Sequence, residues 1–160
     1  MNNPVEQAGI DPVDRLAILA AALPGAAVRQ RRIAAPFDAV WRVIADLEHA
    51  TPRYEPGVTR LHVTSRHGQH LQLLVGRADG GEETMQARLR PGWCLMQSAT
   101  TAVAFAAQQL GSQTLLAHLE HRRVPARLPG PRRSQGRRSW LAKIDEELRV
   151  IERLATQDRR

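Results

Sequence analysis

The order of elements within residues 28–58 constrains the fold more than any other part of the chain. A strand that ends at Ile33 is followed by a turn at Pro36, a short helix, and breaks at Pro52 and Pro56. Proline fixes its φ angle and lacks an N–H, so it suits the first turn of a helix and interrupts the interior of one. The rest of the chain adds hairpins and one long C-terminal helix. We therefore predict an α+β fold in which a curved sheet is wrapped around a helix, a shape that encloses a pocket.

Regularly spaced turn signals predict that the sheet is an antiparallel meander of seven strands. Glycine-containing turns separate segments in which apolar and polar residues alternate, which is typical of a sheet with one solvated face. Short links of this kind join antiparallel neighbours. The turns lie at His67-Gly68, Asp79-Gly80-Gly81, Pro91-Gly92 and Leu110-Gly111-Ser112. The predicted strands cover residues 27–33, 58–66, 69–77, 83–90, 93–99, 101–109 and 112–124.

The predicted strand at residues 101–109 departs from this alternation. Residues 102–107 read Ala-Val-Ala-Phe-Ala-Ala, so both faces of the strand are apolar. Either something covers the outer face, or the strand meets a second subunit in a homodimer. A general compositional preference for alanine explains the pattern nearly as well, so three interpretations stay open.

Helix signals divide the chain into an N-terminal extension at residues 1–25 and one domain at residues 26–157. A short helix begins near Asp11, and the proline-glycine pair at residues 24–25 ends it. We expect this helix to pack on the domain as a cap. The first helix of the domain is predicted at about residues 37–47.

The last predicted helix supplies the element that the sheet grips. It covers about residues 140–157, with Ser139 as a candidate N-cap. A second, shorter helical turn is predicted at residues 51–54. We place Lys143 and Glu147 away from the apolar face of the last helix. That face carries Trp140, Leu141, Ile144, Leu148, Ile151 and Ala155.

The net charge of +7 comes from one segment. Residues 122–138 hold seven arginines and no acidic residue, and the other 16 basic residues balance the 16 acidic ones. The segment contains prolines and glycines but lacks the aromatic residues that nucleic-acid binders commonly place beside basic ones. We interpret it as a solvated loop, with a guanidinium rim that attracts an anionic ligand as the alternative. Nucleic acid ranks as the third functional hypothesis.

We predict that nucleic acid binds residues 122–138 only weakly and without sequence preference. Arginine–phosphate contacts release counterions, so the affinity should be weaker than about 1 μM and should fall steeply with salt. A filter-binding titration at several salt concentrations measures this, with a variant that replaces the seven arginines by serine as control. Tight binding to one nucleic-acid sequence at physiological salt would contradict this prediction and make nucleic-acid binding the leading functional hypothesis.

Composition places the chain among single-domain proteins with an aliphatic core. A length of 160 residues suits one domain, and only six residues are Phe, Trp or Tyr. No apolar run reaches the roughly 20 residues that a membrane helix needs, and acidic residues precede the apolar residues 16–22, unlike a secretory signal. Cys94 is the only cysteine, so no internal disulfide can form. We therefore expect a cytoplasmic location.

A family resemblance rests on residues 33–47, which read Ile-Ala-Ala-Pro-Phe-Asp-Ala-Val-Trp-Arg-Val-Ile-Ala-Asp-Leu and precede a proline-containing turn. In this order of elements the chain resembles the START/Bet v 1-like (SRPBCC) superfamily of helix-grip proteins, and in particular its bacterial polyketide cyclase/dehydrase-like branch. The resemblance covers about residues 26–157 and carries no catalytic signature. It implies a cavity between sheet and C-terminal helix, and it leaves the chemistry open. The N-terminal extension and the arginine-rich segment depart from the family pattern.

The predicted cavity should have a volume of about 300–1,000 Å³. Tyr54 and Glu55 lie at the turn where helix-grip pockets often open, and they are the candidate catalytic residues. A phenol and a carboxylate could transfer protons in an aldol cyclisation and dehydration, whereas ring packing and a solvated carboxylate are the competing interpretation. The candidate ligand-binding residues are Trp41, Leu61, Val63, Leu73, Met85, Leu89, Trp93, Phe105, Leu119, Ile144 and Leu148. Core packing competes with cavity lining for the two tryptophans.

We predict no metal site and no cofactor. His67 and His70 are three residues apart, as are His118 and His121, and residues at this spacing on a strand face opposite sides. We therefore expect surface or edge histidines. Cys94 has no neighbouring base in the sequence, so we expect a buried small apolar residue in place of a nucleophile. The sequence contains no glycine-rich phosphate-binding loop.

We conclude from the sequence that the chain binds a small, mostly apolar molecule. The enzyme hypothesis is a polyketide cyclase/dehydrase-like reaction in which the fold shapes a flexible substrate. The alternative is a non-enzymatic carrier or sensor of a lipid or hydrophobic metabolite. Several convergent ionisable groups at the cavity would favour the enzyme, and a uniformly apolar lining would favour the carrier.

Overall fold

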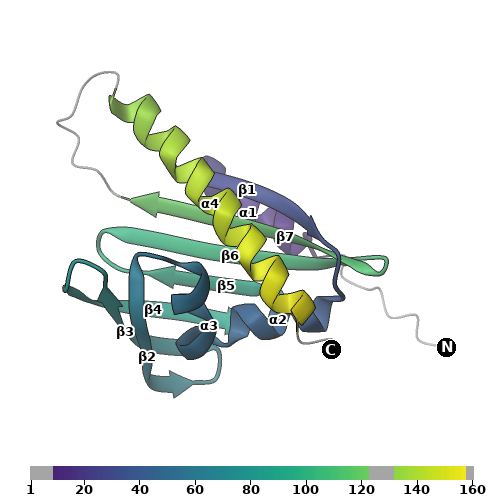
Figure 1. Ribbon diagram of the computed structural model, residues 1–160, viewed down its shortest axis with the longest axis horizontal. Helices are drawn as coiled ribbons and strands as arrows, with labels where there is room; N and C mark the ends of the chain where they lie inside the picture. The colour runs from purple at the N-terminus through teal and green to yellow at the C-terminus, as the bar shows by residue number, and fades with distance from the viewer. Residues whose placement is uncertain (1–8, 123–131, 158–160) are drawn as a thin grey trace.

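Seven antiparallel strands form one open sheet in the computed structural model (Figure 1). The structure describes residues 9–122 and 132–157, with side chains from residue 138 onward in the second range. The strand order is β1-β7-β6-β5-β4-β3-β2, so hairpins join all neighbours except the first pair. The strands are β1 Ala27–Ile33, β2 Val58–His67, β3 His70–Arg77, β4 Glu82–Arg90, β5 Trp93–Gln97, β6 Thr101–Leu110 and β7 Gln113–Arg122.

The predicted strands are confirmed, and their described boundaries differ from the predicted ones by at most two residues. The reason is that each predicted turn contains a glycine with a positive φ angle, at Gly68, Gly80, Gly92 and Gly111. Gly92 is also sterically required, because a Cβ atom there would lie 2.9 Å from the Ala107 carbonyl oxygen. The predicted end of the last strand, residues 123–124, lies outside the described residues.

Four helices accompany the sheet in the described part of the chain: α1 Pro12–Ala22, α2 Phe37–Ala45, α3 Leu47–Tyr54 and α4 Arg132–Gln157. The helical turn predicted at residues 51–54 is a longer helix, because the Asp46 carboxylate accepts a hydrogen bond from the His49 N–H at 3.4 Å and starts it earlier. The predicted break at Pro52 is wrong. Proline removes one backbone hydrogen bond from so short a helix, and the helix continues to Tyr54.

The last helix begins earlier than predicted. It starts at Arg132, so Ser139 lies inside the helix and is not its N-cap. Residues 132–138 of the predicted arginine-rich loop are therefore helical, and residues 123–131 lie outside the described residues. Arginine, serine and glutamine are tolerated in helices, and the single Gly136 costs only about 1 kcal/mol relative to alanine.

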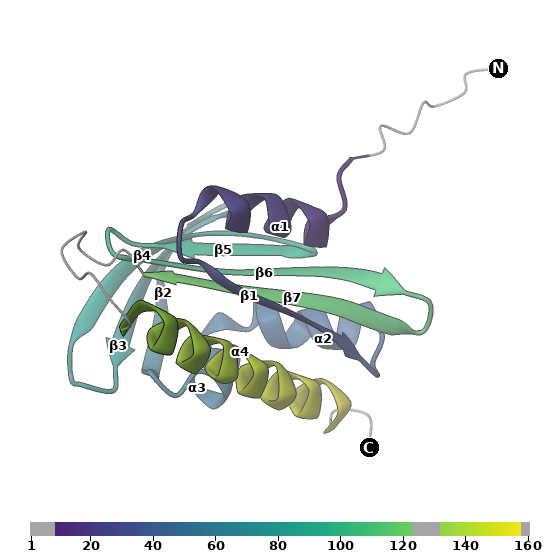
Figure 2. The ribbon, with the colours of Figure 1, turned by 90° about the horizontal axis from the view of Figure 1, so that it is seen from above.

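The helices cover both faces of the sheet (Figure 2). Helices α2, α3 and α4 lie on one face, and α1 lies on the other. The main core fills the space under α2–α4, where Ile44, Leu73, Ile144 and Ile151 are fully buried. The sheet and α4 are therefore arranged as in the predicted helix-grip fold.

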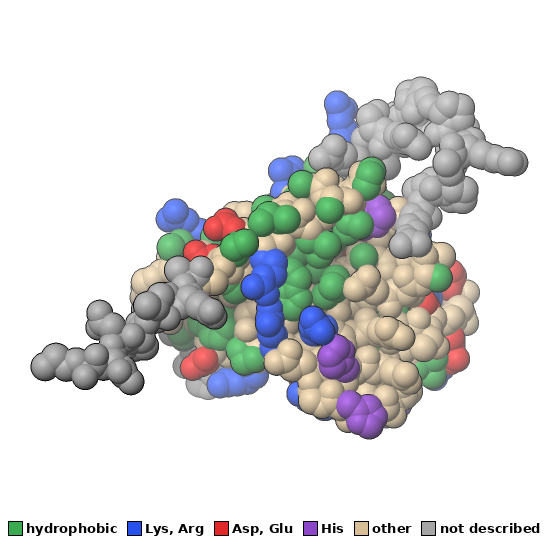
Figure 3. All heavy atoms as spheres, turned by 180° about the vertical axis from the view of Figure 1, so that it is seen from behind, with side chains coloured by type: hydrophobic (Ala, Val, Ile, Leu, Met, Phe, Trp, Pro, Cys, Tyr) green, Lys and Arg blue, Asp and Glu red, His purple; other side chains and the backbone are tan. Residues whose placement is uncertain are grey.

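The extension helix α1 explains the strand that is apolar on both faces. A second cluster of Val13, Leu16, Ala104 and Ala106 joins α1 to the outer face of β6. The first of the three interpretations accounts for the pattern, since a part of the same chain covers that face. Figure 3 shows this side of the molecule, where hydrophobic side chains still reach the surface, and Ile18 on α1 is 58% exposed. None of the described helices has the length and apolar character needed to cross a membrane.

Candidate functional site

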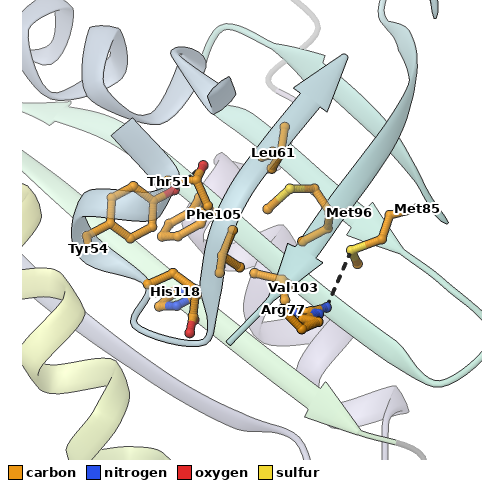
Figure 4. Close-up of a pocket in the computed structure, with 12 residues that line it drawn as sticks. Thr51, Tyr54, Leu61, Arg77, Met85, Met96, Val103, Phe105 and His118 are labelled. Atoms are coloured by element: carbon orange, nitrogen blue, oxygen red, sulfur yellow. Dashed lines mark hydrogen bonds between the residues drawn. The ribbon is translucent and has the colours of Figure 1, made fainter. Parts of the chain in front are cut away.

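A small apolar pocket lies between α3 and the strands of the sheet (Figure 4). Its volume is about 30 Å³, which is room for one or two water molecules. The expected apolar cavity of about 300–1,000 Å³ is therefore not open in this structure, because core side chains fill most of the space between sheet and helix. The inner pocket is lined by Thr51, Tyr54, Glu55, Val58, Leu61, Val75, Arg77, Met85, Met96, Val103, Phe105 and His118.

A wider cleft of about 650 Å³ lies outside the inner pocket and shares three lining residues with it, Glu55, Arg77 and Val103. The outer cleft has a mixed lining of charged, polar and apolar residues. Its other lining residues are Gly57, Ala78, Asp79, Glu83, Thr100, Thr101, Glu120, Arg122, Trp140 and Lys143. A molecule in the outer cleft would therefore meet charged groups first and the apolar pocket behind them.

A buried histidine on β7 adjoins the inner pocket. The side chain of His118 is 1% exposed, and its Nδ1 lies 3.1 Å from the Ala104 carbonyl oxygen. Because a carbonyl only accepts, Nδ1 carries a proton and donates it. The other ring nitrogen, Nε2, lies 2.6 Å from the Glu147 Oε2 atom and 3.4 Å from the Glu120 Oε1 atom. Two carboxylates thus share one imidazole in a site with almost no solvent.

Lys143 completes this cluster from α4. Its Nζ atom lies 2.5 Å from Glu55 Oε2, 2.7 Å from Glu120 Oε1 and 2.8 Å from Glu147 Oε1. Oε1 of Glu147 has this ion pair but no well-directed hydrogen bond among the described residues. Three carboxylates, one ammonium and one imidazole therefore meet where the inner pocket and the outer cleft join; we call them the charged cluster.

Burial and pairing shift the protonation of the charged cluster in opposite directions. Burial lowers the pKa of His118, but Glu120 and Glu147 outweigh burial and raise that pKa to about 9. Burial raises the pKa of Glu120, but His118 and Lys143 outweigh burial and lower it to about 2. Burial raises the pKa of Glu147 to about 7, and the nearby Glu55 and Glu120 add to this effect against the hydrogen bond from His118.

The same cluster has ligand types that bind metals. Donor atoms of His118, Glu120 and Glu147 lie within 4.8 Å of one another. However, the Lys143 ammonium contacts the oxygen atoms of both carboxylates at 2.7–2.8 Å. Because the ammonium already occupies the position between the carboxylates, a metal ion would have to displace it to bind there.

Aromatic rings connect the histidine to the candidate residue Tyr54. Phe105 stacks on the His118 ring with the ring centroids 4.0 Å apart, and Tyr54 meets Phe105 edge-on at 5.8 Å. The Tyr54 hydroxyl lies 3.3 Å from Thr51 Oγ1. Burial raises the pKa of Tyr54 above its ordinary value, so the phenol stays neutral and can donate a hydrogen bond.

Arg77 at the end of β3 lines both the inner pocket and the outer cleft, the two chambers of the site, and contributes a cation to each. Its guanidinium pairs with Glu83 and lies 3.9 Å from the Met85 sulfur atom (Figure 4). Burial raises the pKa of Glu83, but hydrogen bonds from Ser98 and Arg77 outweigh it and lower the pKa below its usual range. The pair is therefore charged, and it leaves part of the guanidinium facing the pocket.

The structure brings together only part of the site predicted from the sequence. Tyr54, Glu55, Leu61, Met85 and Phe105 line the inner pocket. Six other predicted lining residues belong to the main core or pack against it, without lining either chamber: Trp41, Val63, Leu73, Leu89, Ile144 and Leu148.

Trp93 and Leu119 do not lie near the predicted cavity. Both belong to the cluster under α1, on the opposite face of the sheet. The physical reason is strand alternation: Leu119 follows the inward-facing His118, so it points outward. Trp93 likewise precedes Cys94, which is fully buried in the main core. Burial raises the pKa of the Cys94 thiol to about 12, as expected of a small apolar core residue.

The expectation of surface or edge histidines is wrong for His118 and His121. His118 is fully buried, and His121 is 9% exposed with its Nε2 3.0 Å from the Pro24 carbonyl oxygen. His67 and His70 are exposed as expected. The prediction that Glu147 lies away from the apolar face of the last helix is also wrong. Its side chain is 1% exposed and lies on the buried side of α4.

The sequence contained a signal for this misplaced carboxylate. Glu147 lies one helical turn after Ile144 and next to Leu148, within an apolar stripe wider than the one predicted. A glutamate inside such a stripe needs a buried partner. Its position therefore pointed to a cationic or protonated group on the facing strand.

Comparison with known proteins supports the fold. No model of a protein family matches the sequence, and no curated protein matches it. Solved structures do match. TTHA0849 from Thermus thermophilus has a TM-score of 0.67 at 16% identity, over 84% of this chain and 99% of that one. A START superfamily protein from Mycobacterium smegmatis has a TM-score of 0.61 at 17% identity, over 82% and 97%.

An aromatase/cyclase is also among the similar structures. The Zhui aromatase/cyclase from Streptomyces sp. R1128 has a TM-score of 0.62 at 15% identity, over 84% of this chain and 95% of that one. At these identities the similarity concerns the fold. The chain therefore has the helix-grip fold of START superfamily proteins.

Proposed function

We propose that this chain binds a small molecule and catalyses acid–base chemistry on it, as a cyclase or dehydratase of a polyketide-like substrate. The observation that carries the proposal is the charged cluster, in which His118, Lys143 and three carboxylates converge beside an apolar pocket. Convergent ionisable groups of this kind favour an enzyme over a passive carrier. The similarity in fold to an aromatase/cyclase is consistent with this class of substrate.

The proposed reaction needs only proton transfers. A base removes a proton from a carbon that lies between two carbonyl groups. That carbon then attacks the carbon of another carbonyl group further along the chain, and the oxygen of the attacked carbonyl receives a proton to form a hydroxyl. Loss of this hydroxyl as water, with a further proton from the adjacent carbon, completes a dehydration. No oxidant or reductant enters, so residues that hold and move protons suffice.

The pocket residues fit these steps by their charge and position. Glu55 lies in both chambers, so its carboxylate is within reach of a substrate carbon. The neutral Tyr54 phenol and the Arg77 guanidinium are hydrogen-bond donors for a carbonyl oxygen on which negative charge develops. His118 and Glu147 lie behind them and hold the proton that the reaction returns.

Substrate entry requires the inner pocket to enlarge. Met85 and Met96 line the inner pocket together with Leu61 (Figure 4), and methionine side chains adopt many rotamers at little cost. A ligand can therefore displace them without moving the backbone.

The test of the proposed function is turnover of a synthetic linear poly-β-ketone thioester, followed by the absorbance of the aromatic product above the uncatalysed background. Catalysis that is lost in Glu55→Gln and Glu147→Gln supports the proposal. Unchanged rates in both variants, together with a lipid or hydrophobic metabolite detected by native mass spectrometry, would favour the carrier or sensor. The apolar lining of the inner pocket is the feature that supports this second hypothesis.

Tyr54→Phe is predicted to lower turnover by about 100-fold with little change in ligand affinity, since it removes the hydroxyl and keeps the ring. Thr51→Val is the matched control, because it removes the partner hydroxyl and leaves the phenol in place. We expect a smaller loss in the control. Equal turnover in Tyr54→Phe and the unmodified protein would remove Tyr54 from the mechanism.

Two further expectations remain proposals. A cytoplasmic location rests on the single, unpaired cysteine. Homodimerisation through residues 101–109 would have to use the part of the outer face that α1 leaves uncovered, since α1 packs on β6. Light scattering at several protein concentrations tests the dimer.

A further inference from the structure

Lys143 joins carboxylates from three different elements. Glu55 follows the end of α3, Glu120 lies on β7, and Glu147 lies one turn further along α4. The lysine side chain is 34% exposed, whereas those of Glu120 and Glu147 are 3% and 1% exposed. Lys143 lines the outer cleft, so it is the cation that links the two buried carboxylates to the open side of the site.

We propose that Lys143 is a positioning residue that keeps Glu120 ionised and limits proton uptake by Glu147, so that the charged cluster can accept a proton during the reaction. This inference rests on the proposed acid–base function. Lys143 acts through the carboxylates and is not assigned a contact with substrate.

The charge balance of the cluster carries the argument. With every group ionised, three carboxylates face two cations, His118 and Lys143. Without Lys143, the buried Glu120 and Glu147 and the partly buried Glu55 would face one imidazolium, and like charges so close together cannot all stay ionised in a site with so little water. The cluster would then hold its extra proton to a higher pH and lose its capacity to act as a base near neutral pH.

Within the described residues, the neighbouring cations Arg122 and Arg77 have other partners and do not substitute for Lys143. Arg122 lies with its Cζ 5.4 Å from the centroid of the Trp140 ring, and Lys143 Nζ lies 5.8 Å from the same ring. Arg77 in the outer cleft is paired with Glu83. Among the described residues, the titratable and charged groups around the cluster and its outer cleft are Tyr54 and Glu55 at the end of α3, Arg77 on β3, Asp79 in the β3–β4 turn, Glu83 on β4, Cys94 on β5, His118, Glu120 and Arg122 on β7, and Lys143 and Glu147 on α4.

The reciprocal effect on the lysine agrees with this role. Burial lowers the pKa of Lys143, but Glu120 and Glu147 outweigh burial and hold the pKa above its ordinary value. The ammonium is therefore charged throughout the range in which enzymes work. A lysine that donated its own proton in each turnover would need a pKa closer to neutral. The environment of Lys143 therefore favours a permanent positive charge over a role as proton donor.

The experiment compares Lys143→Met and Lys143→Gln, which remove the charge, with Lys143→Arg, which retains it. Arg149→Met is the matched control, because it removes an exposed cation of α4 that pairs only with Glu146 among the described acidic residues. Glutamate carboxyl carbons are titrated by carbon-13 NMR in the free protein. Turnover of the poly-β-ketone thioester is measured across the same pH range.

In Lys143→Met and Lys143→Gln, we expect the carboxyl titration and the acidic limb of the pH–rate profile to move up by about 1–2 pH units. Lys143→Arg should restore both, and Arg149→Met should change neither. A carboxyl titration in Lys143→Gln that coincides with that of the unmodified protein would overturn the inference. A shifted titration in a protein without turnover would retain the role of Lys143 and reject the proposed function, so the two failures are distinguishable.

Discussion

Replacement of Leu148 by aspartate is expected to destabilise the fold by at least about 4 kcal/mol, a large part of the roughly 5–15 kcal/mol that holds a typical domain together. Leu148 is 1% exposed in the core between α4 and the sheet. The substitution removes a packed side chain and buries an unpaired carboxylate, and each effect alone costs several kcal/mol. Urea denaturation followed by circular dichroism measures the change in the free energy of unfolding.

Ala142→Asp is the control for this experiment, since it places the same side chain at an exposed position of the same helix. We expect a change within about 1 kcal/mol, mostly from repulsion by Asp145 and Glu146 three and four residues further on. A Leu148→Asp protein with a near-normal free energy of unfolding would show that α4 is not part of the core.

The melting temperature is expected to fall as the pH rises from about 6.5 to 9. The folded state holds the His118 proton with a pKa of about 9, whereas the ordinary value is 6.5. A raised pKa contributes stability that is fully present below pH 6.5 and is lost as the pH passes through 9. Glu147, whose pKa is raised from 4.5 to about 7, changes stability in the same direction but at lower pH, between about 4.5 and 7. The loss is on the order of 3 kcal/mol, or about 5–10 °C.

Calorimetry of His118→Gln tests the origin of this pH dependence. Glutamine retains hydrogen-bonding groups but does not titrate, so the melting temperature should become nearly independent of pH between about 7 and 9. The control is His49→Gln, because His49 is an exposed histidine whose pKa is raised by Asp46. That control should keep the full decrease. A decrease of equal size in His118→Gln would assign the effect to other groups.

The fold was predictable because its signals are local. Alternating residues and a glycine at four of the five hairpin turns determined the strands, and Pro36 marked the start of α2. The start of α4 was not predictable in the same way. A run of arginine with proline and glycine favours a loop by composition, whereas tertiary packing of the later apolar residues supports the helix to which Arg132 belongs.

The site was less predictable because its contacts connect distant parts of the chain. His118 and Glu147 are 29 residues apart in the sequence, and Lys143 and Glu55 are 88 residues apart. A histidine three residues from another histidine carries no information about which carboxylates face it. Tyr54 and Glu55 were predicted from their position at the turn after a helix, and both line the inner pocket.

The two chambers meet at Glu55, Arg77 and Val103, and this bottleneck separates two kinds of evolutionary change. Substitutions deep in the pocket, as at Leu61 or Met96, would alter which molecular shapes fit, while the proton chemistry stayed the same. Substitutions of Glu120 or Lys143 in the outer cleft would alter the proposed proton chemistry and leave the apolar lining unchanged. Under the proposed function, a lineage with this architecture can explore new substrates through apolar residues without losing its reaction, whereas mutations at Tyr54, His118 or the bottleneck would change shape and proton chemistry at once.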